Sequence, residues 1–278
     1  MSYIKDFDVN EVILQLETKG YAVIKGCIDQ NILKELLEGV KSGSVSIGEG
    51  NEIPRLNKGS DFLYIPFLRD QRFLKLFREE PIDIILRHFL NDPYYKGLEG
   101  KPNYILRSMI CRSSKEVLPW HIDSFIPYQG DHVTTMQVVI PLESFTHDNG
   151  PTLLMPGSHL SGEFAPQGIE NRSEVTKVIA DPGDLVLWDS RIWHSATKNN
   201  TSNSRWAIVS TFTRWWIKQN YRFDEMIFNY KLIKYFTDED LIVLGIASVT
   251  PSSHVESVEV KGGMERIRIF REKCKQSA

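Results

Sequence analysis

The chain has 278 residues, of which 41% are hydrophobic and 25% charged, a composition typical of a globular protein with a sizeable core. Its net charge of −3 offers no excess of basic side chains for nucleic acid or for an anionic membrane surface. No run of about 18 apolar residues occurs, so no membrane-spanning segment is predicted. Together, the charge and the lack of such a run predict neither a nucleic-acid partner nor a membrane partner.

The cysteines and the first residues bear on the compartment. Cys27, Cys111 and Cys274 are few and widely spaced, which fits neither a disulfide framework nor a CxxC zinc motif. Residues 1–10 lack the apolar run of a signal peptide. These patterns predict a reduced, cytoplasmic protein, and they do not indicate an oligomeric state.

The first hundred residues are predicted to be mainly helical. Residues 8–42 have helical spacing at both ends, with a strand expected at residues 20–26 and Asp29 as the N-cap of the second helix. A loop rich in Gly, Ser and Asn is expected at residues 43–60. Residues 73–90 have the spacing of one amphipathic helix, which the polar turn after it should end.

Beyond about residue 101 the pattern changes to short, β-branched strands separated by turns. Asn149-Gly150 is a strong hairpin-turn signal, and residues 181–184 form a second turn. We therefore expect a mainly β protein with flanking helices and a sandwich or barrel core, of which the double-stranded β-helix, or jelly roll, is one form. The predicted strands cover residues 103–112, 133–142, 152–155, 185–188 and 205–216.

These patterns predict one domain over residues 1–278. Helical support is expected at about 1–100, the jelly-roll core at about 101–216, and a helical, lid-forming segment at about 217–278. Helical character is clearest at residues 221–245, whereas the polar tail after Thr250 predicts no defined element.

A candidate metal site begins at His121-Ile122-Asp123. On an extended strand, His121 and Asp123 point to one face and can reach one metal ion, while Ile122 points into the packing. A histidine from a distant strand would complete a set of two histidines and one carboxylate. Such a set leaves three coordination positions open on iron(II), for a keto acid and for oxygen.

His194 is the best candidate for the third ligand among the seven histidines. It follows the predicted strand 185–188 after a short connection, which places it at the rim of a strand. The other histidines lie in helical, turn-like or polar sequence, and His159, for example, follows Pro-Gly-Ser. A single histidine is more often structural than a ligand, so the interpretation depends on the combination of residues.

Arg205 is the residue that adds weight to this combination. It stands 11 positions after His194 and shares a face of its predicted strand with Ala207. A guanidinium inside an apolar barrel needs an anionic partner, and its planar fork fits a carboxylate. Ala207 would leave room for a small dicarboxylate. The alternative is that Arg205 pairs with an internal Asp or Glu.

The whole pattern resembles the phytanoyl-CoA dioxygenase-like family of iron(II)/2-oxoglutarate oxygenases. The resemblance covers roughly residues 10–216 and includes the "NGP…PGSH" segments at 148–152 and 155–159 and the strand at 183–188. It implies a jelly-roll, cupin-like core, with iron(II) as metal, 2-oxoglutarate and O2 as co-substrates, and succinate and CO2 as products. The matching site residues are the catalytic metal ligands His121, Asp123 and His194, and Arg205 for 2-oxoglutarate.

Thr135 and Gln137 are further candidates for binding the co-substrate. They share a face of the predicted strand 133–142, and a buried polar pair in an apolar strand needs a reason. Either they line the 2-oxoglutarate or substrate pocket, as members of the family often do near Gln137, or the strand is an edge with a wet face. Four aromatic residues near the motifs either line the cavity or pack the core: Trp120, Phe125, Trp188 and Trp193.

The resemblance implies hydroxylation of an unactivated C–H bond in a small-molecule metabolite, as in secondary metabolism. Asp123 disfavours halogenation, because related halogenases have a small residue at this position. Desaturation, ring closure and ketone formation stay open, and the segments expected to select the substrate are residues 43–60 and 215–235. Two other functions are a non-oxidative cupin-type isomerase or hydrolase, which would not need Arg205, and a metal-binding module without turnover.

Overall fold

The computed structural model describes residues 7–42, 61–95, 98, 100–113, 115–250, 253–255 and 262–276. The loop expected at residues 43–60 therefore lies outside the described residues. The chain forms two compact units, Met1–Pro66 with Met109–Ser210 and Phe67–Ser108 with Thr211–Ala278. The strands β3 and β10 contribute residues to both units.

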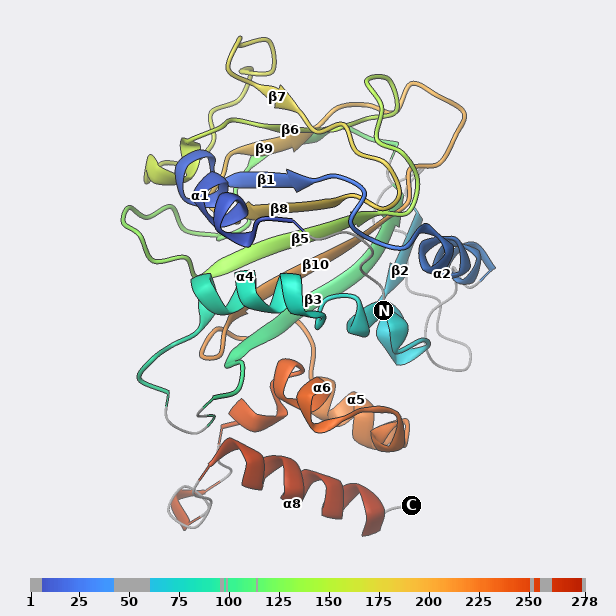
Figure 1. Ribbon diagram of the computed structural model, residues 1–278, viewed down its shortest axis with the longest axis vertical. Coiled ribbons are helices and arrows are strands. Elements are labelled where there is room, and N and C mark those ends of the chain that lie inside the picture. Colours follow the sequence, from blue (N-terminus) through green and yellow to red (C-terminus); the bar gives the residue numbers. More distant parts are fainter. Residues whose placement is uncertain are drawn as a thin grey trace. The chain divides into compact units, whose positions relative to one another are not determined.

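Two sheets form the core, and their strands can be followed in Figure 1. The six-stranded sheet has the order β1-β8-β5-β10-β3-β2, and the four-stranded sheet has the order β4-β9-β6-β7. The chain repeatedly passes from one sheet to the other, which is the arrangement of a jelly roll, so the predicted fold class is confirmed. The strands are β1 (Tyr21–Ile24), β2 (Asp61–Tyr64), β3 (Tyr104–Ser113), β4 (Leu118–His121), β5 (Thr135–Pro141), β6 (Thr152–Leu154), β7 (Thr176–Lys177), β8 (Leu185–Asp189), β9 (His194–Ala196) and β10 (Ala207–Arg214).

The Asn149-Gly150 turn is present, but the hairpin predicted from it is wrong. Strand β5 pairs with β8, whereas β6 pairs with β7 and β9 of the other sheet. Gly150 has φ +81°, and a Cβ there would lie 2.8 Å from the carbonyl oxygen of Thr197. The dipeptide thus specifies a turn that only glycine fits easily, while the strands it joins find their partners elsewhere.

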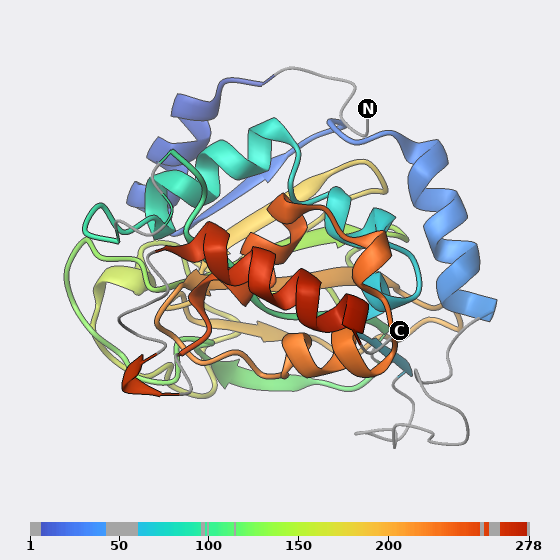
Figure 2. The ribbon, with the colours of Figure 1, turned by 90° about the horizontal axis from the view of Figure 1, so that it is seen from below.

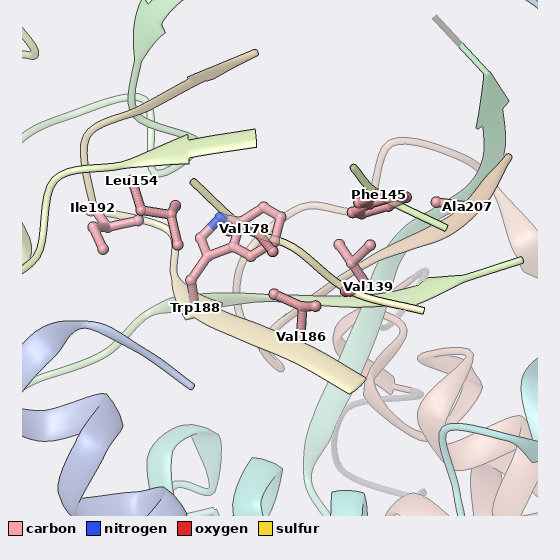
Figure 3. Close-up of a cluster of buried hydrophobic side chains, with 9 residues drawn as sticks. Val139, Phe145, Leu154, Val178, Val186, Trp188, Ile192 and Ala207 are labelled. Atoms are coloured by element: carbon pink, nitrogen blue, oxygen red, sulfur yellow. The ribbon is translucent and has the colours of Figure 1, made fainter. Parts of the chain in front are cut away.

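An apolar core lies between the two sheets of the first unit (Figure 3). Val139, Val186 and Trp188 come from the six-stranded sheet, and Leu154 comes from the four-stranded sheet. Val139 is the register partner of Val186, so both side chains point to the same face. Since Trp188 is in the same cluster, this face of β5 and β8 is the inner one, which decides where their polar residues point.

Two helices flank the first strand. Asp8 caps α1 (Val9–Lys19) by accepting hydrogen bonds from the main chain of its first turn, and Gly20 ends it at φ +82°. Asp29 accepts a hydrogen bond of 2.8 Å from the main-chain N–H two residues later, at the start of α2 (Gln30–Ser42). Both predicted helices and the N-cap at Asp29 are confirmed.

The second unit corrects one helix prediction. Residues 73–90 form two helices, α3 (Arg72–Lys75) and α4 (Glu80–Leu90), instead of one. Pro81 lies in the first turn of α4, where its missing N–H costs no helical hydrogen bond. In a continuous helix the same proline would interrupt the hydrogen-bond ladder, so the chain begins a new helix there.

Helices also form the C-terminal part of the second unit. The predicted helical character of residues 221–245 is confirmed by α5 (Phe223–Asn229) and α6 (Asp238–Val243). The sequence did not predict α8 (Gly263–Gln276), which contacts α6 and lies beside the other C-terminal helices in Figure 2. No helix in the described ranges is both long and apolar enough to cross a membrane. Short 3-10 helices are Pro66–Leu68, Ser158–Leu160, Ile233–Tyr235 and Ile246–Ser248.

Candidate metal centre

Three side chains of the first unit converge at the ends of β4 and β9. His121 and His194 are register partners in this antiparallel pair, with ring centroids 4.0 Å apart. The carboxylate of Asp123 lies 3.6 Å from Nε2 of His121 and 3.2 Å from Nε2 of His194. One ligand atom from each residue lies within 4.8 Å of the others, so the three can reach one ion.

Both imidazoles are oriented by main-chain carbonyl groups. Nδ1 of His121 lies 2.8 Å from the carbonyl oxygen of Pro119, and Nδ1 of His194 lies 3.0 Å from that of Ile192. A carbonyl can only accept, so each Nδ1 carries the proton and donates it. The Nε2 lone pairs are left to face Asp123, as metal-binding histidines require.

The charges of the cluster are strongly coupled. Burial acts to raise the pKa of Asp123, but the charges of His194 and His121 lower it below the usual value. Burial acts to lower the pKa of His194, yet the Asp123 carboxylate raises it. A cation is therefore favoured between these side chains, and the donor set of two nitrogens and one oxygen fits iron(II).

The connection between β8 and β9 holds two of the three side chains in place. The carbonyl oxygen of Ser190 accepts a hydrogen bond of 2.8 Å from the main-chain N–H of Asp123. On either side of Ser190, Asp189 and Arg191 form a buried ion pair with a shortest distance of 2.6 Å. The Arg191 guanidinium also stacks 4.6 Å from the ring centre of Tyr128. The ion pair with its stacking contact, here called the Asp189–Arg191 clamp, fixes the connection between β8 and β9. This connection anchors Asp123 through Ser190 and leads to His194.

The histidine that resembles part of the family's "PGSH" segment lies apart from the metal ligands. His159 is buried, and its Nε2 lies 3.1 Å from the carbonyl oxygen of Glu17. It also packs so closely against Gly20 that a Cβ there would lie 2.6 Å from Nδ1. His159 therefore fixes the end of α1, in line with the turn role that the sequence indicated.

Arg205 is a half-buried cation whose guanidinium has no partner of opposite charge among the described residues. Its main-chain N–H donates to Oγ of Ser113, and its guanidinium lies 4.7 Å from the ring centre of Phe145. Its Nε is buried without a hydrogen-bond partner, and none of the described Asp or Glu residues forms an ion pair with it. Burial and then the nearby charge of Arg112 lower its pKa to about 10. The ion pair with an internal Asp or Glu, offered as the alternative, does not occur among the described residues.

Arg112 is a second half-buried arginine, and the sequence analysis missed it. It lies on β3, opposite Phe62 of β2, and stacks 5.3 Å from the ring centre of Phe62. Its Nε is also buried without a partner. Burial lowers its pKa, while Tyr64 and Asp123 act to raise it. In the sequence it is one of two arginines of the predicted strand 103–112, and nothing there distinguishes it from other charged residues at strand ends.

Thr135 and Gln137 are both buried, with 4% of their surface exposed. Gln137 is the register partner of Trp188, whose side chain lies in the core between the sheets. Thr135 and Gln137 share a face, so both point toward the inner side of the sheet. Strand β5 lies between β8 and β10, so it is not an edge strand with a wet face.

The four aromatic residues near the motifs separate into two groups. Trp120 packs with Leu153 in a second apolar cluster, and Trp193 packs against that cluster. Trp188 belongs to the main core. Phe125 is 68% exposed and has φ +66°, which is unusual for a bulky residue. Three of the four are therefore packing residues, and Phe125 alone is exposed beside the metal ligands.

Comparisons with known proteins agree on one family. The sequence model described as "Phytanoyl-CoA dioxygenase (PhyH)" matches residues 16–207. An uncharacterised protein of Mycobacterium tuberculosis is 34% identical over 208 residues, which cover 73% of this chain and 75% of that protein. The multifunctional dioxygenase prhA of Penicillium brasilianum is 26% identical over 219 residues, covering 70% of this chain and 69% of that protein.

Solved structures share the fold. The non-heme alpha-ketoglutarate-dependent epimerase SnoN from nogalamycin biosynthesis has a TM-score of 0.56 and 18% identity, with coverage of 74% of this chain and 82% of that protein. HygX from Streptomyces hygroscopicus, solved with nickel and 2-oxoglutarate, has a TM-score of 0.59 and 11% identity, with coverage of 75% and 88%.

Proposed function

The chain belongs to the phytanoyl-CoA dioxygenase family of oxidoreductases, and from this premise we propose that it is an iron(II)- and 2-oxoglutarate-dependent dioxygenase that hydroxylates an unactivated C–H bond of a small-molecule metabolite. One observation carries the proposal. The cluster of His121, Asp123 and His194 lies in the same unit as Arg205, a half-buried arginine that lacks an anionic partner in the described chain. A metal site alone would not require that cation.

The metal ligands have separate tasks. His121 and His194 would hold iron(II) through Nε2, and Asp123 through a carboxylate oxygen. Together with 2-oxoglutarate and O2, the bound iron supplies the oxidising chemistry, and succinate and CO2 leave as products. The Pro119 and Ile192 carbonyl groups keep both rings in the tautomer that can bind metal. Asp123 occupies the position at which a halide would bind, which favours hydroxylation over halogenation.

Arg205 would bind the carboxylate of 2-oxoglutarate that lies far from the metal. The guanidinium is half-buried and stacked on Phe145, so its planar fork is held in place before the ligand arrives. Ala207 follows on the same face and belongs to the cluster in Figure 3, where it lies beside Phe145. Gln137 and Thr135, which point to the inner side of the sheet, would line the same pocket.

The remaining expectations extend this proposal. Residues 1–278 would act as one catalytic domain, with helical support at about 1–100, the core at about 101–216 and a lid at about 217–278. Cys27, Cys111 and Cys274 are buried and form no disulfide, which supports a reducing compartment and, we propose, the cytoplasm. A non-oxidative cupin-type enzyme would leave Arg205 without a task, so the oxidative reaction is preferred.

The deciding experiment is an anaerobic titration of 2-oxoglutarate into the iron(II)-loaded protein. We expect a weak visible charge-transfer band in the parent protein and none in His194→Ala. Admission of O2 with a substrate should then convert 2-oxoglutarate to succinate in an iron-dependent manner. If the folded, iron-loaded parent protein showed neither the band nor succinate, the proposed function would be wrong.

A further inference from the structure

The first unit contains a second half-buried cation, Arg112, for which the proposed reaction has no use. Arg112 lies on β3, its Nε is buried without a hydrogen-bond partner, and none of the described acidic residues forms an ion pair with it. Asp123 acts to raise the pKa of Arg112, and Arg112 in turn acts to lower that of His121. The next residue of β3, Ser113, accepts a hydrogen bond of 2.9 Å from the main-chain N–H of Arg205, so Arg112 is adjacent in the chain to a residue that contacts Arg205.

Arg112 has a polar neighbour that opens toward solvent. Phe62 is the register partner of Arg112, and Tyr64 follows two residues later on the same face of β2, its ring stacked on Phe62 at 5.7 Å. Phe62 and Tyr64 are half-buried. Burial raises the pKa of Tyr64 and Arg112 acts to lower it, so the phenol keeps its proton at neutral pH and can donate it.

Charge counting separates Arg112 from the co-substrate. Arg112, Arg205 and Asp123 together carry one net positive charge, and iron(II) raises this to three. The two carboxylates of 2-oxoglutarate remove two, and in the proposed function one of them binds the metal and the other Arg205. One positive charge then remains, on Arg112, and leaving it unpaired in a partly buried site is unfavourable.

We propose that Arg112 and Tyr64 form an anion subsite that binds a carboxylate group of the primary substrate, which makes that substrate a carboxylic acid. This inference rests on the proposed function, because it assigns the other cation and the metal to 2-oxoglutarate. The guanidinium would donate two parallel hydrogen bonds to the carboxylate, and the Tyr64 hydroxyl would donate a third. The single negative charge of this carboxylate matches the one positive charge that remains on Arg112.

Binding measurements can test the subsite without turnover. The protein is loaded with zinc(II), which supports no oxidation, and saturated with 2-oxoglutarate. A panel of aliphatic, aromatic and amino carboxylic acids, each paired with its methyl ester, is then titrated by calorimetry. For members that bind, we expect the acid to bind the parent protein about ten- to a hundredfold more tightly than the ester. Arg112→Gln should abolish this preference, and Tyr64→Phe should reduce it.

Three controls define the outcome. Arg172→Gln removes one charge from an exposed position and should keep the preference. Arg112→Lys keeps the charge but loses the fork, so it should retain part of the preference and serves as a second variant if Arg112→Gln does not fold. The affinity for 2-oxoglutarate should stay within about twofold in Arg112→Gln.

Each contrary result has a distinct meaning. Equal binding of acids and esters by the parent protein would overturn the subsite, as would an acid preference that survives Arg112→Gln. Loss of 2-oxoglutarate affinity in Arg112→Gln as large as in Arg205→Gln would make Arg112 a co-substrate contact and also overturn it. A zinc-loaded parent protein that fails to bind 2-oxoglutarate would instead count against the proposed function.

Discussion

His121 lies directly opposite His194 across the β4–β9 pair, so two of the three candidate ligands are held by sheet register. The third, Asp123, donates its main-chain N–H to the carbonyl oxygen of Ser190, which lies in the connection between β8 and β9. Sites built on strands keep their geometry better than sites built on loops. The metal centre is therefore expected to be formed before the metal arrives.

Substitution of any candidate ligand should abolish metal-dependent stabilisation. A metal that binds only the folded chain, at one hundred times its Kd, stabilises it by about 2.7 kcal/mol. The parent protein should therefore melt at a higher temperature with iron(II) or zinc(II) than with a chelator. His121→Ala, Asp123→Ala and His194→Ala should lose this difference and turnover while remaining folded. Full activity in a folded His194→Ala protein would show that the ligand assignment is wrong.

Two other histidines provide matched controls for the metal experiment. His147 is exposed, so His147→Ala should keep both the metal-dependent stabilisation and turnover. His159→Ala should also keep them, but it removes the buried contact with the Glu17 carbonyl group and should cost about 1 kcal/mol of stability. Denaturation in urea with and without metal separates these two effects.

Arg205 should determine the affinity for 2-oxoglutarate. Charge-assisted hydrogen bonds are worth roughly 1.5–3 kcal/mol, so Arg205→Ala should weaken binding by about ten- to a hundredfold. Arg205→Lys should recover only part, because an ammonium group cannot reproduce the fork. Iron binding should persist in both variants. Anaerobic titration of 2-oxoglutarate into the iron-loaded proteins measures these affinities.

The same variants distinguish a structural role for Arg205. Since the guanidinium has no ion-pair partner in the described chain, Arg205→Ala should leave the melting temperature of the metal-free protein unchanged or higher. A lower melting temperature together with unchanged 2-oxoglutarate affinity would mean that Arg205 serves the fold.

The buried Asp189–Arg191 pair should support both stability and metal binding. Arg191→Met would leave the Asp189 carboxylate buried and unpaired, and removal of one partner of such a pair costs about 3–5 kcal/mol. Metal affinity should fall as well, because Ser190 between them anchors Asp123. Urea denaturation and zinc titration measure the two effects, with the exposed Arg172→Met as a control that should change neither. Unchanged metal affinity in folded Arg191→Met would show that the clamp does not position Asp123.

Gly150 lies in the turn that joins strands of the two sheets, and Gly26, elsewhere in the chain, provides a matched control. Both have positive φ, but a Cβ at Gly150 would meet the Thr197 carbonyl oxygen at 2.8 Å, whereas one at Gly26 would meet nothing within 4 Å. Gly26→Ala should therefore cost only the backbone strain, about 1–2 kcal/mol, and Gly150→Ala should cost more. Equal losses in the free energy of unfolding would mean that the backbone near Thr197 moves aside.

The sequence was sufficient to predict site residues where their type and spacing had a single physical explanation. His121 and Asp123 two positions apart, with His194 after a strand, predicted side chains that the structure brings together. It was insufficient where the answer depended on which strands become neighbours. Arg112 resembled any charged residue near a strand end until the pairing of β2 with β3 placed it opposite Phe62. The prediction of a hairpin at Asn149-Gly150 was wrong for the same reason.

Helix α8 was missed for a different reason. Its sequence is rich in charged residues, and only a narrow stripe, including Ile267 and Cys274, is buried. The helix contacts α6, and no pattern within the segment itself indicates that contact. Tertiary contacts, more than propensity, stabilise most helices of this kind.

Pairing of β1 with β8 has a consequence for the nascent chain. The register partner of Tyr21 is Trp188, which lies far along the chain and is therefore synthesised long after Tyr21 has left the ribosome. Until then, the inner face of β1 has no sheet to join, and its apolar side chains are open to unwanted association. Pairing over so large a separation in sequence also slows folding. Pairing of β1 can therefore begin only after β8 has been synthesised, and the yield of folded protein should be sensitive to chaperones that bind exposed apolar segments.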